Sequence, residues 1–172
     1  LAAVVCVMLA NGMLRTLLRV RAELEGFSTA VTGVVLAGYF TGFLAGAWGV
    51  PRFIASVGHI RVYAALASLA STATLVHIIT TSPYAWGAAR LVTGFSMSGL
   101  YIVAESWLND QATNESRGRL LSVYMVVVMG GIALGQLLLT VADPGGFVLF
   151  VLASVLVSMA VIPITLSASE AP

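Results

Sequence analysis

The stretch LLSVYMVVVMGGIALGQLLLTVA, residues 120–142, decides the fold class, because it contains no acidic or basic side chain. A transmembrane helix needs about 20 mainly apolar residues to cross the hydrocarbon core of a bilayer. Five other stretches have a similar length and character. The sequence therefore predicts an all-α membrane protein with six transmembrane helices, at about residues 1–20, 29–50, 62–81, 84–104, 120–142 and 147–166.

The composition of the whole chain agrees with this prediction. Of its 172 residues, 59% are hydrophobic and 9% are charged, whereas a soluble domain has about 45–50% and about 25%. The net charge of +1 gives no reason to expect a nucleic-acid partner. Cys6 is the only cysteine, so the chain has no internal disulfide and no thiolate metal site. Hydrolase, metalloprotease and nucleotide-binding motifs are absent from the sequence, so we expect neither an enzyme nor a cofactor.

The arginines predict the orientation of the helices in the membrane. Four arginines lie in the connections after the second and fourth predicted helices: Arg52, Arg61, Arg117 and Arg119. Connections rich in Lys and Arg remain on the cytoplasmic side, so we expect both chain ends there, in a cell membrane. Arg19 and Arg21 lie at the opposite end and oppose the rule, but Glu23 and Glu25 are beside them.

A weak internal repeat relates the two halves of the chain. Three matching pairs are each separated by 85 residues: Gly33 and Gly118, Tyr39 and Tyr124, and Gly46 and Gly131. Since each unit contains three helices, the second unit is inverted relative to the first. Two inverted three-helix repeats are an architecture of secondary transporters.

Small residues form a stripe on the second predicted helix, where Gly38, Gly42 and Gly46 recur every four positions. Glycine lets two helix backbones approach closely where lipid offers no hydrophobic driving force. We therefore expect a close helix–helix contact here. An alternative interpretation is a sliding contact against a second six-helix half.

Arg90 is the strongest candidate for a functional side chain. It lies about six residues into the fourth predicted helix, with Tyr101 further along near the same face. A charged side chain inside a membrane helix needs a partner or a wet cavity. Arg90 either holds an anionic substrate group, or pairs with an acid that takes up protons, or has a structural role against helix-end carbonyls.

A second polar stripe runs along the first predicted helix. Asn11, Arg15 and Arg19 follow each other at four-residue spacing, which places them on one face of a helix. Such a face is expected to line a cavity, unless the helix ends early and the arginines extend to the headgroups. Gln136 in the fifth predicted helix is a further cavity candidate.

Charged residues also gather near the cytoplasmic end of the fourth predicted helix. Glu105 closes this helix, and Arg117 and Arg119 precede the next. These residues predict an ion-pair cluster on the cytoplasmic side, and Arg52, Gly58 and Arg61 of the 51–61 connection are further candidates for a cytoplasmic gate. The alternative is a set of exposed loop charges that contribute little energy.

Several motifs resemble those of the major facilitator superfamily. The segment 51–61 resembles its loop motif G-x-x-x-D-R-x-G-R-[RK], with a match at Gly58 and a nearby base at Arg61. Residues 90–94, RLVTG, resemble its R-x-x-[QG]-G signature at Arg90 and Gly94. Residues 99–109, GLYIVAESWLN, with RGR at 117–119, are similar to a largely uncharacterised bacterial subgroup.

The resemblance spans residues 1–172 and implies half of a 12-helix major facilitator fold, with a carboxy-terminal half beyond this chain. It implies a secondary transporter that moves a small-molecule substrate by alternating access, driven by a coupling proton or another ion. Two other functions stay open at this point. One is a self-associating six-helix channel or transporter, and the other is a membrane scaffold or sensor without transport.

Overall fold

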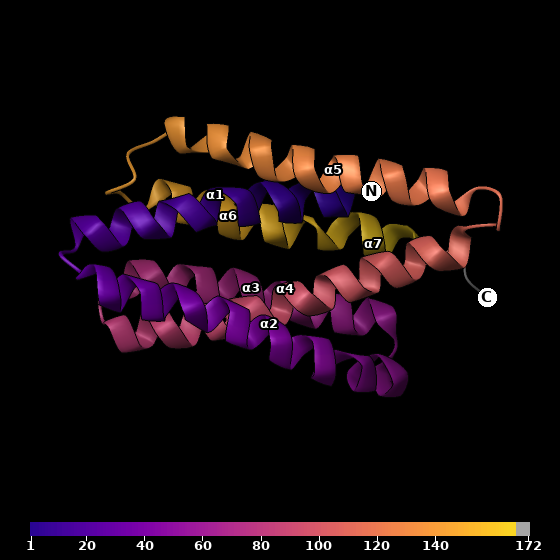
Figure 1. The fold of residues 1–172 in the computed structure, drawn as a ribbon, viewed down its shortest axis with the longest axis horizontal. Coiled ribbons are helices and arrows are strands. Elements are labelled where there is room, and N and C mark those ends of the chain that lie inside the picture. Colours follow the sequence, from indigo (N-terminus) through magenta and orange to yellow (C-terminus); the bar gives the residue numbers. More distant parts are fainter. Residues whose placement is uncertain (168–172) are drawn as a thin grey trace.

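The computed structural model describes residues 1–167, which form helices and no strand. The long helices lie side by side along the length of the molecule (Figure 1). In chain order they are α1 (Ala2–Leu24), α2 (Thr29–Val57), α3 (His59–Ile79), α4 (Pro83–Gln111), α5 (Arg117–Leu137) with the 3-10 turn η1 (Leu138–Thr140), α6 (Val148–Met159) and α7 (Val161–Ser167). Together, α6 and α7 occupy the place of the sixth predicted helix.

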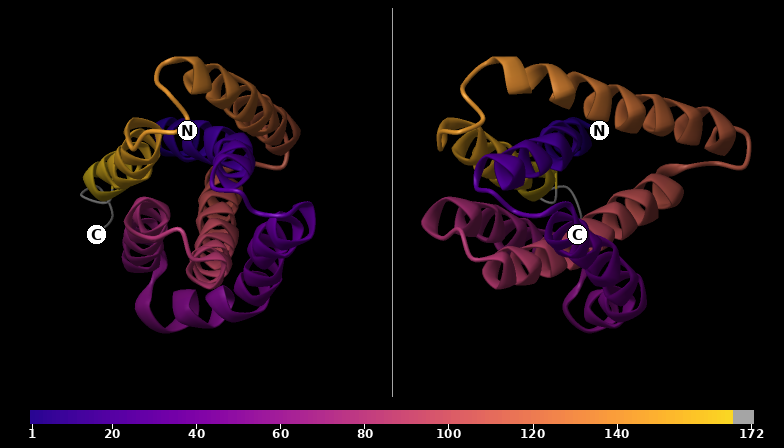
Figure 2. Two further views of the ribbon diagram at one scale, coloured as in Figure 1. Left: turned by 90° about the vertical axis from the view of Figure 1, so that its left-hand side faces the viewer. Right: turned by 60° about the vertical axis from the view of Figure 1, so that its left-hand side comes forward.

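The helices alternate in direction along the bundle. The connections α1–α2, α3–α4 and α5–α6 lie at one end, on the left of Figure 1. The connections α2–α3 and α4–α5 lie at the other end, toward which the first residues of α1 and the end of α7 also point. In the end-on view on the left of Figure 2, α4 runs through the middle of the bundle. Its main neighbours are α2 and α3, while α1 packs on α5 and α6.

Three helices run past the ends that the hydropathy of the sequence predicts. Helix α1 continues to Leu24, so the alternative that the first helix ends early is wrong. The expected loop over residues 51–61 is wrong, because α2 continues through Pro51 to Val57 and α3 begins at His59. Gly58 alone makes the turn, with a φ of 91° that favours glycine. Similarly, α4 extends past the predicted end at residue 104 to Gln111. Apolar character ends at the membrane surface, whereas backbone hydrogen bonds continue a helix into water.

Five segments are long and apolar enough to cross a membrane: α1, α2, α3, α5 with η1, and α6 with α7. The remaining long helix, α4, does not meet this criterion although we expected it to cross. Its central position explains the difference, because it buries polar side chains such as Arg90, Thr93 and Ser96 against other helices. Although α4 runs the length of the bundle beside α2 and α3 (Figure 1), it is not among the five segments that meet the criterion.

The expected close glycine contact is confirmed between α2 and α4. A Cβ atom on Gly42 would overlap the backbone of Leu91, and one on Gly46 would lie 2.6 Å from the Phe95 carbonyl oxygen. From the other side, a Cβ on Gly94 would overlap the backbone of Tyr39. The backbones of α2 and α4 are therefore in direct contact, which fixes the side chains on their shared faces.

Candidate functional site

A groove of about 420 Å³ lies between α1, α2 and α4. This volume falls within the roughly 300–1,000 Å³ that is typical of small-molecule sites. Spacings of three and four residues put the contributing side chains of α4 on one helix face, and the glycine contact holds that face beside α2. The groove is lined by Arg15 of α1, by Tyr39, Phe40, Phe43 and Ala47 of α2, and by Ser98, Tyr101, Ile102 and Glu105 of α4.

Tyr39 lies between two arginines at one end of the groove. The Cζ atom of Arg90 is 4.5 Å from the centroid of the Tyr39 ring, and the Cζ atom of Arg15 is 5.9 Å from it. Arg90 is 3% exposed and does not line the groove, whereas Arg15 is exposed and does. A guanidinium over an aromatic face is attracted by the quadrupole of the ring. Tyr39 therefore lies close to both a buried cation and an exposed one.

Three buried polar atoms beside this end of the groove lack a hydrogen bond of normal geometry. The Tyr39 hydroxyl and the Nδ2 atom of Asn11 are both buried without an acceptor, and so is the Nε atom of Arg90. Asn11 is 1% exposed and lies one turn from Arg15 on α1. Buried donors usually find acceptors. This end of the groove thus carries an excess of hydrogen-bond donors.

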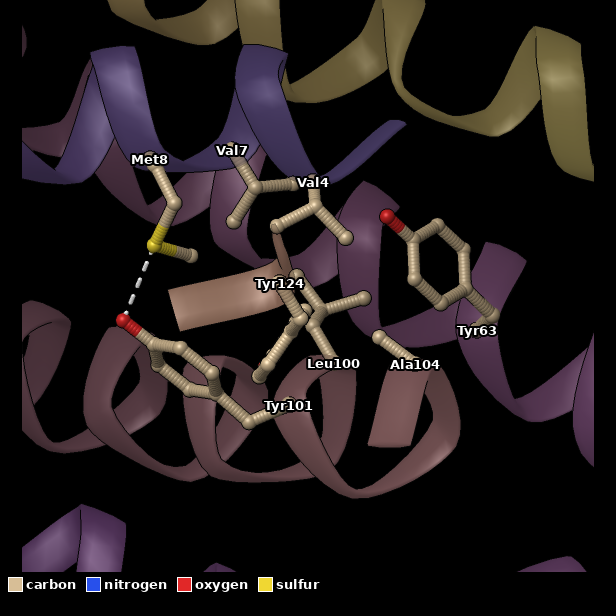
Figure 3. A pocket seen from close by; sticks show the side chains of 8 residues that line it. All are labelled: Val4, Val7, Met8, Tyr63, Leu100, Tyr101, Ala104 and Tyr124. Carbon is tan, nitrogen blue, oxygen red and sulfur yellow. Dashed lines mark hydrogen bonds between the residues drawn. The ribbon is translucent and has the colours of Figure 1, made fainter. Parts of the chain in front are cut away.

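Tyr101 closes the groove toward α1. Its hydroxyl donates to the Sδ atom of Met8 at 3.0 Å (Figure 3). Its ring lies 6.0 Å from that of Phe43 on α2, centroid to centroid. Beyond it, apolar side chains of α1 and α4 meet Tyr63 of α3 and Tyr124 of α5 in a nearly filled pocket (Figure 3). Tyr101 therefore separates the groove from the packed interior.

Gln136, a predicted cavity residue, lies at the contact between α5 and α1. Its Nε2 atom donates to the Gly12 carbonyl oxygen at 2.5 Å, and its Oε1 atom accepts from the Thr16 hydroxyl at 2.7 Å. A Cβ on Gly135 would overlap the backbone of Leu9, so the two helices are in direct contact. Gln136 is thus engaged in helix packing and is not among the side chains that line the groove.

The predicted ion pair of Glu105 with Arg117 or Arg119 is not formed in this structure. Within residues 1–167, the ion pair that forms is between the Nε atom of Arg21 and the Oε1 atom of Glu25, which are 2.7 Å apart. This pair lies at the opposite end of the bundle. Glu105 instead accepts a hydrogen bond from the Tyr124 hydroxyl at 3.2 Å. Because α4 continues for six residues beyond Glu105 to Gln111, nearness in sequence did not bring the charges together.

The other predicted gate residues surround the α2–α3 and α4–α5 end of the bundle. Arg52 is exposed and stacks on Trp48, with its Cζ atom 4.1 Å from the ring, and donates to the Trp48 carbonyl oxygen at 2.6 Å. Arg61, Arg117 and Arg119 are exposed. His59 connects this turn to α4, since its Nε2 atom lies 3.1 Å from the Ser106 hydroxyl oxygen.

The sequence reading missed the aromatic wall of the groove on α2. Tyr39, Phe40 and Phe43 lie at neighbouring positions of that helix, and the Tyr39 ring is 5.6 Å from Phe40 and 6.1 Å from Phe43. Aromatic residues in an apolar helix are ordinarily lipid-facing or packed, so their type gives no signal. The glycine stripe contained the useful information, because it fixes which neighbouring positions face α4.

Comparison with known proteins gives one family. A family model described as "Sugar (and other) transporter" matches residues 5–168. An uncharacterized MFS-type transporter of Yersinia pestis (strain Pestoides F) is 32% identical over 131 residues, which are 76% of this chain and 34% of that protein. The uncharacterized MFS-type transporter YcaD of Escherichia coli O45:K1 (strain S88 / ExPEC) is 37% identical over 133 residues, 77% of this chain and 35% of that protein.

The five long apolar helices define a multi-pass membrane protein. The chain belongs to the major facilitator superfamily, as its motifs predicted. It spans about a third of the length of the curated relatives that it matches.

Proposed function

We propose that this chain is the amino-terminal six-helix half of a secondary active transporter, which moves a small solute across the cell membrane by alternating access. Membership of the superfamily supports transport, and the share of the relatives' length supports a half. Scaffold, sensor and self-associating channel are not favoured, because nothing in these relatives suggests them. An ion gradient is the proposed energy source.

The packing of the helices supports an inverted repeat. Helix α2 of the first unit packs on α4 of the second, and α5 of the second unit packs on α1 of the first. If α1, α2 and α3 are exchanged with α4, α5 and α6 in order, the α2–α4 contact becomes the α5–α1 contact. Both contacts are made through glycines, Gly42 and Gly46 on α2 and Gly131 and Gly135 on α5. The same exchange relates the α3–α4 contact to the α6–α1 contact.

The groove is the proposed part of the substrate path in this half. The single observation that carries this proposal is the cavity that brings Arg15, Tyr101 and Glu105 together from two helices. Substrate sites of such transporters lie near the middle of the bilayer between the halves. Arg90 would act on the solute from behind Tyr39, and Asn11 from the adjacent turn of α1.

The residues at the arginine-rich end form the proposed cytoplasmic gate. In this structure Glu105 is exposed and accepts a hydrogen bond from the Tyr124 hydroxyl. In a second state of the cycle, Glu105 would exchange this partner for Arg117 or Arg119. Gly58 would serve as the turn about which α2 and α3 move, with Arg52 and Arg61 on either side of it.

Two measurements test the proposal. The natural reading frame should encode about 380 residues. This is the length of the Yersinia relative, because the 131 matched residues are 34% of it. A frame that ends after this chain would contradict the half and favour a self-associating protein. The full-length protein in proteoliposomes should accumulate solute from a screening mixture only while an ion gradient is present. Accumulation that survives collapse of every gradient would contradict secondary transport.

A further inference from the structure

The charges of the groove are unevenly distributed. Arg15 and Arg90 lie around Tyr39 at one end, and Glu105 lines the other end. Ser98 and Glu105 are seven residues apart on α4, which corresponds to about 10 Å along the helix axis. Within the described chain, neither arginine has a carboxylate within bridging distance. The arginine end of the groove therefore has an uncompensated positive charge.

The hydrogen-bonding groups at this end are also one-sided. The guanidinium of Arg15 has only donors. In the described part of the chain no carboxylate bridges to Arg15, and the Tyr39 hydroxyl, which can donate, is buried without a partner. A solute that fits here must bring acceptor oxygens and negative charge. A carboxylate meets both requirements, because it is acceptor-only and pairs with a guanidinium in a two-pronged geometry.

The remaining wall of the groove is mainly apolar. Phe40, Phe43 and Ile102 line it between the two charged ends. The rings of Phe43 and Tyr101 are 6.0 Å apart and form one corner of the cavity. A fully polar anion would lose hydration against these side chains without gaining hydrogen bonds. The wall therefore favours a solute with an apolar or aromatic body.

We propose that the groove binds a small organic monocarboxylate with an apolar body, with Arg15 on the carboxylate and Phe43 and Tyr101 against the body. This proposal rests on the proposed transport function and names its substrate class. Arg90 acts through Tyr39 and is a positioning residue. A second negative charge is disfavoured because Glu105 lies at the other end of the same groove.

The test uses the purified full-length transporter and three matched solutes. Benzoate is the anionic probe, benzyl alcohol the neutral one and benzylamine the cationic one, and each is titrated while the melting temperature is followed. Benzoate should raise the melting temperature in a concentration-dependent way, and the other two should not. Arg15→Gln should weaken benzoate binding by about 10-fold to 100-fold, the effect of losing charge-assisted hydrogen bonds.

A matched control lies on the same helix. Arg19 is exposed and one turn from Arg15, but it does not line the groove. Arg19→Gln should therefore bind benzoate like the wild type. Since Arg15 is exposed too, both variants should fold, and each is checked as a single species by size-exclusion chromatography. Equal stabilisation by benzylamine, no stabilisation by benzoate, phenylacetate or octanoate, or full binding by Arg15→Gln would overturn the proposal.

Transport is measured separately so that the two proposals can fail independently. If proteoliposomes accumulate neutral or cationic solutes and Arg15→Gln leaves this unchanged, the carboxylate site is wrong and transport stands. If benzoate binds through Arg15 but no solute is accumulated under any gradient, the carboxylate site stands and transport is wrong.

Discussion

Arg90 shows how this bundle accommodates a charge with an aromatic ring in place of an acid. Insertion of an arginine at the centre of a membrane helix costs about 2.5–3.5 kcal/mol on insertion scales. A desolvated cation over an aromatic face recovers about 2 kcal/mol. The Tyr39 ring, 4.5 Å from the Arg90 Cζ atom, thus offsets most of that cost. Among residues 1–167, no carboxylate lies within bridging distance of Arg90.

The first prediction separates the ring of Tyr39 from its hydroxyl. Tyr39→Leu removes the face on which Arg90 lies and should lower stability by about 1–2 kcal/mol. Tyr39→Phe should be at least as stable as the wild type, because the hydroxyl is buried without a partner. Thermal unfolding of both purified variants measures the difference. An equal loss in the two variants would show that the hydroxyl and not the ring is needed.

The second prediction concerns the function of Arg90. Arg90→Ala should abolish uptake, because Tyr39, which lines the groove, then loses the buried guanidinium that packs on its ring. Arg90→Lys should retain partial uptake if charge alone is needed, and none if the flat guanidinium must stack on Tyr39. Uptake is measured in proteoliposomes and normalised to inserted protein. Full uptake by a well-expressed Arg90→Ala variant would show that Arg90 is structural.

At the scale of the helices, the sequence predicts more of the fold than of the site. Six apolar runs identify the helices, and the glycine stripe identifies the α2–α4 contact. The ends of the helices are missed because hydropathy reports the membrane rather than backbone hydrogen bonding, as the continuation of α2 through Pro51 shows. The site, in contrast, depends on which faces of two helices pack against each other. Arg15 and Glu105 were found as charges in apolar surroundings, but Phe43 and Tyr39 become groove residues only through the packing of α2 on α4.

The third prediction tests that packing with two glycines of one helix. A Cβ on Gly42 would overlap the backbone of Leu91, whereas Gly33 has no atom within 4 Å of its Cβ position. Gly42→Ala should destabilise the protein by about 3 kcal/mol or more, because a backbone atom has no rotamer in which to move away. Gly33→Ala should be neutral or stabilising by up to about 1 kcal/mol through helix propensity.

Yield and melting temperature of the two glycine variants provide the measurement. The matched change to leucine should widen the contrast, since Gly33 has open space for a larger side chain. Equal tolerance of alanine and leucine at both positions would mean that α2 and α4 are not in backbone contact in the membrane. The groove would then lose the contact that holds its α2 and α4 walls in place.

At the scale of the whole molecule, the arginines divide unequally between the two ends of the bundle. The end with the α2–α3 and α4–α5 connections has four exposed arginines: Arg52, Arg61, Arg117 and Arg119. The opposite end has Arg19 and Arg21, and Arg21 is paired with Glu25. Arg21 also donates to the carbonyl oxygens of Gly145 and Gly146 in the α5–α6 connection. Arg21 therefore has structural partners at its own end of the bundle, so it counts less against the predicted orientation in the membrane.

The fourth prediction is that the four-arginine end is cytoplasmic, as the excess of arginine in its connections requires. Single cysteines are placed at three exposed positions in a Cys6→Ser background: Ser56 and Ser116 at that end, and Thr81 at the other. In intact cells, a membrane-impermeant maleimide should label Thr81→Cys alone. After lysis it should label all three, which controls for reactivity. Labelling of Ser56→Cys and Ser116→Cys from outside would reverse the topology and place the Glu105 end of the groove on the external side. The proposed gate would then control entry from outside the cell, whereas the charge pattern of the groove, and with it the choice of a carboxylate, would be unchanged.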